Sequence, residues 1–213
     1  RNFNVECPNQ TMPMFLSNHG RCIWSDEPFK FSISNGVFQI EGNNVVLESF
    51  GSTLREAYLG AMNKYFPPSE DNPPEEFFTK PQYNTWMQMT YNPTQEKVLN
   101  YAKDIIANGF VPGHLIIDEG WQKYYGQWEF DPIKFPDPKK MVEELHSMGF
   151  TVMLWVTPFV RPDGEFFLRC IDKRFNPDSY NKLFLRNAQG EIALTKWWNG
   201  YSSLIDFTNP GAV

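Results

Sequence analysis

Apolar and polar residues alternate along the first part of the chain. Residues 29–34 place apolar side chains at every second position, as a half-buried strand does. Asn35-Gly36 follows at once and is a strong signal for a two-residue hairpin turn. Similar short runs, separated by turns that contain Asn and Gly, extend from residue 14 to residue 50. Regular short strands of this kind predict an antiparallel β-sandwich.

The pattern then changes to one short helix and a segment without apolar period. Residues 53–62 have helical spacing, with Ser52 or Thr53 as the cap. Residues 66–76 are rich in proline and acid, which suits an extended linker. We therefore predict three parts, namely a β-sandwich part at residues 1–65, a linker at 66–82 and a second domain at 83–213.

Strand-like and helix-like segments alternate after the linker. Residues 83–90, 114–118 and 150–157 are short apolar runs that predict strands. Two amphipathic helices are expected between them, the first with Asn92 as its cap and the second starting at Asp137-Pro138. A repeat of roughly 30 residues per unit predicts a parallel sheet, in a (β/α)8 barrel or a doubly wound fold. No glycine-rich phosphate loop follows a strand, which counts against the nucleotide-binding version.

The last part of the chain departs from this repeat. Residues 158–200 lack a regular pattern, and residues 183–194 predict a hairpin inserted after the third strand. Thr208-Asn209-Pro210 resembles a helix start a few residues before the final Val213. Because three or four strand–helix units do not close a barrel and would leave unpaired edges, we expect the chain to be part of a longer polypeptide.

Composition and charge exclude several classes of partner and site. The net charge is -6 with a pI near 5.1, which argues against nucleic acid or an anionic membrane surface. No apolar run approaches the roughly 20 residues of a membrane span. Three cysteines are too few for a disulfide framework, although one Cys7–Cys22 bond is compatible with the sequence without being favoured. The histidines lack ligand spacing, so we expect no metal and no cofactor.

The compartment stays open at this level. Asn9-Gln10-Thr11 fits a glycosylation acceptor, which matters only in a secreted eukaryotic protein.

Aromatic residues, at 16% of the chain with seven tryptophans, allow two interpretations. Large rings ordinarily fill cores and interfaces. A ring face also stacks on the C–H face of a sugar, so aromatic side chains beside polar groups are typical of carbohydrate sites. Composition alone favours the core.

The strand at residues 114–118 carries the most informative chemistry. It begins with aliphatic residues and ends at Asp118, and Glu119, Gly120 and Trp121 follow. A short buried strand of this kind belongs in a parallel sheet, where groups at the carboxyl end meet ligand. Strand alternation predicts that Glu119 points away from Asp118 and is structural.

The second part of the chain contains an ordered set of motifs, namely Tyr83-Asn84-Thr85-Trp86 and residues 116–122, 128–138, 144–150 and 206–210. This set resembles glycoside hydrolase family 31, the α-glucosidase and α-galactosidase family. The resemblance covers residues 80–213 well, whereas the N-terminal part is similar only in type. It implies a partial (β/α)8 TIM barrel preceded by an antiparallel β-sandwich, in the α/β class.

The resemblance also implies a retaining mechanism with two aspartates, whose carboxyls lie roughly 5–5.5 Å apart. Both are expected beyond Val213, so no catalytic residue is assigned in this chain. Asp118 aligns with the aspartate that hydrogen-bonds the hydroxyls of the reacting sugar. Glu119-Gly120-Trp121 is closer to α-galactosidase-type relatives than to α-glucosidases.

We predict five substrate-binding residues and one function. The residues are Asp118, Trp121, Trp155, Trp198 and Trp86, with core packing as the alternative for Trp121 and Trp155. The predicted function is part of a retaining α-glycosidase that removes terminal α-glucosyl or α-galactosyl units from oligosaccharides or glycosides. Its partners are that substrate and the remainder of the parent chain, without which the fragment is expected to be inactive. The alternative is a non-catalytic carbohydrate-binding or scaffolding protein on the same fold.

Overall fold

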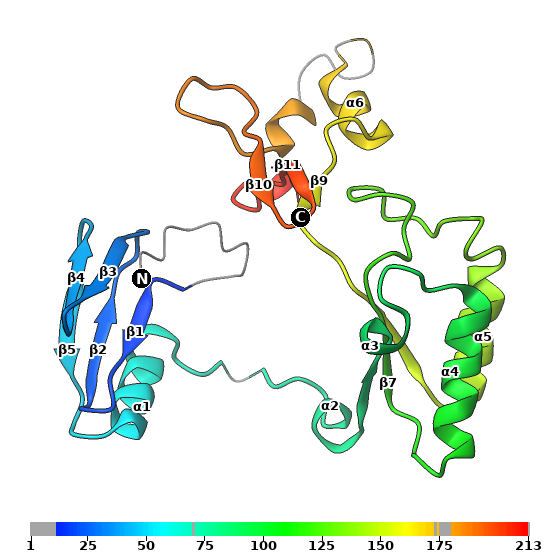
Figure 1. Cartoon of the computed structure of the whole chain (residues 1–213), viewed down its shortest axis with the longest axis horizontal. Helices are drawn as coiled ribbons and strands as arrows, with labels where there is room; N and C mark the ends of the chain where they lie inside the picture. The colour runs from blue at the N-terminus through cyan, green and yellow to red at the C-terminus, as the bar shows by residue number, and fades with distance from the viewer. Residues whose placement is uncertain (1–11, 70, 173, 175–179, 213) are drawn as a thin grey trace. The chain divides into compact units, whose positions relative to one another are not determined.

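The computed structural model describes residues 12–69, 71–172, 174 and 180–212. Cys7 and the Asn9-Gln10-Thr11 acceptor lie outside them, while Cys22 is a buried free thiol. The chain divides into two compact units, Arg1–Asn72 and Pro73–Val213 (Figure 1).

The first unit consists of antiparallel strands and one helix. Its elements are β1 (Met14–Leu16), β2 (Arg21–Trp24), β3 (Lys30–Ser34), β4 (Val37–Glu41), β5 (Val46–Ser49) and α1 (Leu54–Tyr65). The strands form a sheet of order β1-β2-β5 and a separate β3-β4 hairpin, joined by ring contacts of Phe15 with Phe31 and Phe38. The predicted strands are therefore confirmed, and a complete sandwich stays a prediction.

Local signals set the turns of this unit. Asn35 and Gly36 have φ values of 50° and 75°, as the predicted hairpin turn requires. Thr53 caps α1 in a capping box with Glu56.

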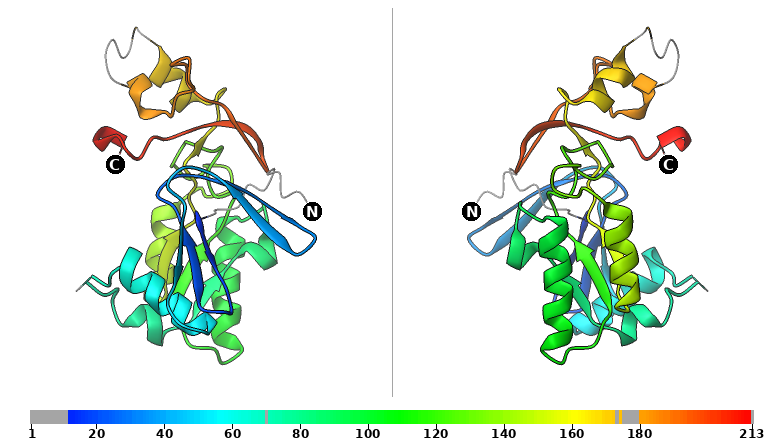
Figure 2. Two further views of the ribbon diagram at one scale, coloured as in Figure 1. Left: turned by 90° about the vertical axis from the view of Figure 1, so that its left-hand side faces the viewer. Right: turned by 90° about the vertical axis from the view of Figure 1, so that its right-hand side faces the viewer.

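The second unit is built on a parallel sheet. Its strands β6 (Gln82–Asn84), β7 (His114–Ile117) and β8 (Thr151–Leu154) pair in that order, all parallel. Helices α4 (Gln95–Ala107) and α5 (Pro138–Ser147) lie side by side against the sheet, as Figure 2 shows from the right. Their apolar faces form one core with β7. The core members are Met89, Val98, Ala102, Ile105, Leu115, Ile117, Trp121, Phe135, Met141, Leu145 and Phe150.

Two sequence predictions near the start of this unit are wrong in detail. The first strand stops at Asn84 rather than at residue 90, and the helical turn α3 (Trp86–Met89) follows. The cap of α4 is Thr94, which has an extended backbone and whose side-chain oxygen accepts a hydrogen bond from the Lys97 amide, so Asn92 precedes the cap.

The linker predicted at residues 66–82 is not extended throughout. It contains the helical turn α2 (Glu76–Thr79), which is fixed to the start of β7. His114 hydrogen-bonds the Glu76 carbonyl oxygen at 3.1 Å and stacks on Phe77. These contacts reach from residue 76 to residue 114, which local composition does not reveal.

The chain leaves the strand–helix repeat after β8. Short elements follow, namely β9 (Phe159–Val160), α6 (Glu165–Ile171), η1 (Tyr180–Leu183), β10 (Thr195–Trp197), β11 (Gly200–Leu204) and η2 (Pro210–Ala212). The predicted hairpin at 183–194 is present in short form, with an antiparallel Arg186–Ile192 bridge and a hydrogen bond from the Ala193 amide to the Leu185 carbonyl oxygen. A second hairpin, β10–β11, pairs with β9. Helix α6 was not predicted, because its N-cap, Gly164, offers no side-chain bond.

None of the helices that the structure describes is both long and apolar enough to cross a membrane.

Candidate functional site

A pocket of about 540 Å³ opens at the carboxyl ends of the parallel strands. The ends of β6, β7 and β8 supply Asn84, Asp118 and Trp155, respectively. The remaining wall comes from α3 and its following loop, from Glu119, and from the turn between β10 and β11. The full lining is Asn84, Trp86, Met87, Tyr91, Asp118, Glu119, Trp155 and Trp198.

Asp118 is held by groups from two strand ends. Its Oδ2 accepts a hydrogen bond from Asn84 Nδ2 at 2.7 Å, and its Oδ1 accepts one from the Glu119 backbone amide at 2.7 Å. Its own amide donates to the buried hydroxyl oxygen of Thr85 at 2.9 Å. A carboxylate has about four acceptor positions. The bonds from Asn84 and Glu119 therefore orient Asp118 and leave acceptor capacity for hydroxyl groups of a ligand.

The turn α3 is pinned so that Trp86 and Met87 face this pocket. The Trp86 amide donates to Asn84 Oδ1 at 2.7 Å, which starts the turn. The turn ends at Thr90, a β-branched residue with φ of 46°, a conformation that costs about 1–3 kcal/mol. Such strain persists only where neighbouring contacts impose it.

Lys134 supplies such a contact. Its ammonium donates to the carbonyl oxygen of Tyr91 at 3.1 Å and to that of Gly120 at 2.9 Å. The loops after β6 and β7 are thereby joined behind the pocket. Gly120 allows the approach, since a Cβ there would lie 2.7 Å from the Tyr91 carbonyl oxygen and its φ is +95°.

Glu119 also lines the pocket, contrary to the prediction from strand alternation. Strand β7 ends at Ile117, so the alternating directions of a strand no longer apply to the two acids. Glu119 is only 4% exposed. Burial, together with the negative charge of Asp118, raises its pKa above the ordinary value, and hydrogen bonds from Asn199 and Trp198 oppose that rise.

Three of the four predicted tryptophans line the pocket. Trp86, Trp155 and Trp198 come from separate segments and meet there. Trp121 does not line it, because its ring is 2% exposed in the core and lies edge-on against Phe130. Its indole nitrogen donates to the Trp155 carbonyl oxygen at 2.7 Å, so Trp121 supports a pocket residue from behind.

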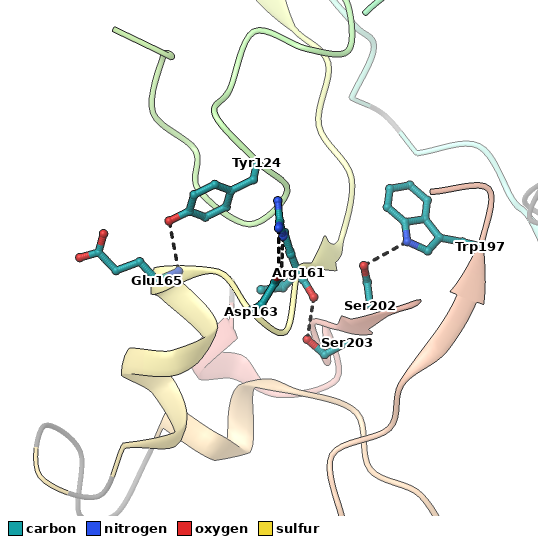
Figure 3. A network of polar contacts seen from close by, with 8 residues as sticks. Tyr124, Arg161, Asp163, Glu165, Trp197, Ser202 and Ser203 are labelled. Carbon is teal, nitrogen blue, oxygen red and sulfur yellow. Dashed lines mark hydrogen bonds and ion pairs between the residues drawn. The ribbon is translucent and has the colours of Figure 1, made fainter. Parts of the chain in front are cut away.

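The hairpin β10–β11 is anchored by polar and ring contacts. Trp197 stacks on Phe159 with ring centroids 4.1 Å apart, and its indole donates to Ser202 Oγ at 3.0 Å. Ser203 Oγ donates to the Val160 carbonyl oxygen at 3.0 Å. Figure 3 shows these bonds beside the Arg161–Asp163 ion pair and the bond from the Glu165 amide to the Tyr124 hydroxyl. The turn that carries Trp198 is therefore fixed to the segment after β8.

Several lining residues were not selected from the sequence. Asn84 lies within the motif Tyr83-Asn84-Thr85-Trp86, but the strand was predicted to continue to residue 90, so the pattern did not place Asn84 at a strand end. Met87 and Tyr91 carry no chemical pattern, and they line the pocket only because the chain turns at α3. In the part of the chain that the structure describes, no three His, Cys, Asp or Glu side chains gather as metal ligands would.

Comparison with known proteins identifies relatives of this chain. The model of the glycosyl hydrolases family 31 TIM-barrel domain matches residues 77–213. A mouse myogenesis-regulating glycosidase is 34% identical over 163 residues, which are 76% of this chain and 22% of that protein. The α-xylosidase XylQ of Lactiplantibacillus pentosus is 23% identical over 223 residues, covering 96% of this chain and 26% of the relative.

A solved structure supports the same fold. The family 31 dextranase of Flavobacterium johnsoniae in complex with glucose superposes with a TM-score of 0.64 at 19% identity, covering 94% of this chain and 24% of that chain. The parallel strands and helices of the second unit are thus part of a TIM barrel. The chain spans about a quarter of the length of these relatives.

Proposed function

The chain belongs to glycosyl hydrolase family 31, and from this premise we propose that the whole protein is a retaining α-glycosidase. Its substrates are terminal α-linked sugars on oligosaccharides or glycosides. Residues 83–213 contribute the first strand–helix units of the catalytic barrel, residues 1–65 contribute to an N-terminal β-sandwich, and residues 66–82 connect them. In this proposal the nucleophile and the acid/base lie beyond Val213.

The environment of Asp118 carries the proposal. A carboxylate with unused acceptor positions faces three indole rings across one pocket. Hydrogen bonds from sugar hydroxyls to a charged acceptor are among the stronger kind, and ring faces accept the C–H face of the sugar. Pockets of a few hundred Å³ suit one or two sugar units. We therefore assign sugar binding to Asp118, Trp86, Trp155 and Trp198, with Trp121 holding Trp155 in place.

The number of acids in the pocket bears on which sugar it binds. Glu119 places a second acid beside Asp118, and both line the pocket. A pair of acids can receive more hydroxyl groups of one sugar than a single acid can. We propose that an α-galactoside or an α-glucoside is the substrate, to be compared with an α-xyloside because XylQ is an α-xylosidase.

Hydrolysis of the three nitrophenyl α-glycosides by the whole protein tests this function. Replacing Asp118 by Ala should lower kcat/KM more than a hundredfold, about 3 kcal/mol, because two charge-assisted bonds to the sugar are lost. The matched control is Asp104→Asn, an exposed carboxylate on α4, which should leave kcat/KM unchanged.

Two other outcomes would contradict the proposal. If Asp118→Ala leaves kcat/KM unchanged, Asp118 does not bind the substrate. If the whole protein binds sugar but hydrolyses no glycoside, it is a carbohydrate-binding protein on the same fold and not an enzyme.

A further inference from the structure

Asn199 connects two elements that are distant in the sequence. It lies in the turn between β10 and β11, next to Trp198. Its Nδ2 donates to Glu119 Oε1 at 3.1 Å and also to the hydroxyl oxygen of Tyr125. An amide nitrogen carries two hydrogens, so these two bonds use both of them.

The turn itself does not require asparagine. Trp197 pairs with Gly200, which leaves Trp198 and Asn199 as a two-residue loop. Asparagine is favoured in such loops where φ is positive. Among the described residues, the non-glycine positions with positive φ are Asn35, Asn44 and Thr90, and Asn199 is not one of them. The side chain of Asn199 is therefore better explained by its contacts than by its backbone.

The contacts of Asn199 converge on the pocket. Glu119 and Trp198 both line it, and Trp198 also hydrogen-bonds Glu119. Asp118 is the charged neighbour of Glu119 at the end of β7, and the Tyr125 hydroxyl oxygen accepts the second hydrogen bond of the Asn199 amide. Two neutral donors thus hold a buried carboxylate next to a second carboxylate.

We propose that Asn199 is a positioning residue, which locks the Glu119 carboxylate and the Trp198 indole into one rigid wall of the sugar pocket. This role rests on the proposed function, because it assigns a specificity-setting wall to the same site. Asn199 acts through Glu119 and Trp198 and does not itself line the pocket. Replacing Asn199 should therefore change how well the sugar binds, and so KM more than kcat.

Two substitutions distinguish positioning from a merely structural role. Asn199→Ala removes both donors and should raise KM about tenfold at every pH, with a smaller change in kcat. Asn199→Asp places a carboxyl group against Glu119, so the two repel when both are ionised. At lower pH a shared proton restores a donor between them, and the loss in kcat/KM should shrink toward the wild-type value. A structural role alone gives no recovery at low pH.

The control is the loss of an asparagine side chain from another exposed turn, at residue 187. The hydrogen bonds that the structure describes for the Asn187 side chain all stay within its own loop, with Glu191 and Gln189. Asn187→Ala should therefore keep the wild-type KM and pH profile. Hydrogen exchange of residues 195–204 in the sugar-free protein gives a second readout. Exchange there should increase in Asn199→Ala and stay unchanged in Asn187→Ala.

The results separate this inference from the proposed function. An active wild type whose Asn199 variants keep the wild-type KM, pH profile and exchange overturns the positioning role and leaves the function standing. A wild type that hydrolyses no glycoside contradicts the function. In that case unchanged exchange in Asn199→Ala overturns the locking of the hairpin, and increased exchange supports it.

Discussion

At the scale of single residues, the two acids at the end of β7 differ in their surroundings. Asp118 has acceptor capacity open to the pocket, whereas Glu119 is buried and is met by donors from the hairpin turn. The place of Asp118 at the pocket could be predicted from the sequence, because a strand end in a parallel sheet is a usual ligand position. The position of Glu119 could not, because it depends on where β7 stops.

The raised pKa of Glu119 gives a stability prediction. A carboxyl group whose pKa is raised in the folded state stabilises the fold below its ordinary pKa, and this contribution is lost as pH rises through the folded-state value. Glu119→Gln stays neutral and still accepts the Asn199 bond. We therefore expect the variant to be more stable than the wild type at pH 7, with a difference that shrinks toward zero as the pH falls to the ordinary range of a glutamate carboxyl.

Thermal unfolding across this pH range measures the effect. The control is Glu143→Gln on α5, whose side chain is 65% exposed and should show no such trend. A difference between Glu119→Gln and wild type that is constant with pH would contradict the prediction.

At the scale of elements, the helices and strands with clear local signals were predictable. The hairpin turn at Asn35-Gly36, the capping box of α1 and the start of α5 at Asp137-Pro138 all appear where the sequence places them. Elements that depend on distant contacts were not predictable. Turn α2 is held by His114, and α6 begins at a glycine without a capping side chain.

The cap of α4 can be tested directly, because the structure assigns it to Thr94 and the sequence pattern predicted Asn92. The Thr94 side-chain oxygen accepts a hydrogen bond from the Lys97 amide, so Thr94→Ala should lower the free energy of unfolding by about 1 kcal/mol. Asn92, the cap predicted from the sequence, precedes Thr94, and Asn92→Ala should cost less than half as much. Urea unfolding of both variants decides between them, and the opposite order of stabilities would place the cap at Asn92.

At the scale of the whole molecule, the chain combines two compact units, Arg1–Asn72 and Pro73–Val213. The pocket draws its lining from residues 84 to 198, all within the second unit. Periodicity predicted the parallel sheet and the change of character between the units. It did not predict the Asn199–Glu119 bond, whose partners are 80 residues apart.

The division into units predicts separate responses to substitution. In the first unit, the Tyr65 hydroxyl donates to Glu48 Oε2 at 2.6 Å, and burial beside Glu48 raises the pKa of Tyr65 to about 12. Tyr65→Phe should lower the stability of this unit by about 1 kcal/mol, since one charge-assisted bond is lost. Calorimetry should show one transition at lower temperature, with the transition of the second unit unchanged. A shift of both transitions by the same amount would show that the units unfold together.

The hairpin β10–β11 has a consequence for the divergence of such proteins. Its turn forms part of the pocket, yet the hairpin pairs with β9 and takes no part in the register of β6, β7 and β8. An insertion or deletion in this excursion can reshape the pocket while the parallel strands keep their pairing. The lining of the pocket can therefore diverge between related proteins at this hairpin without any change to the barrel strands.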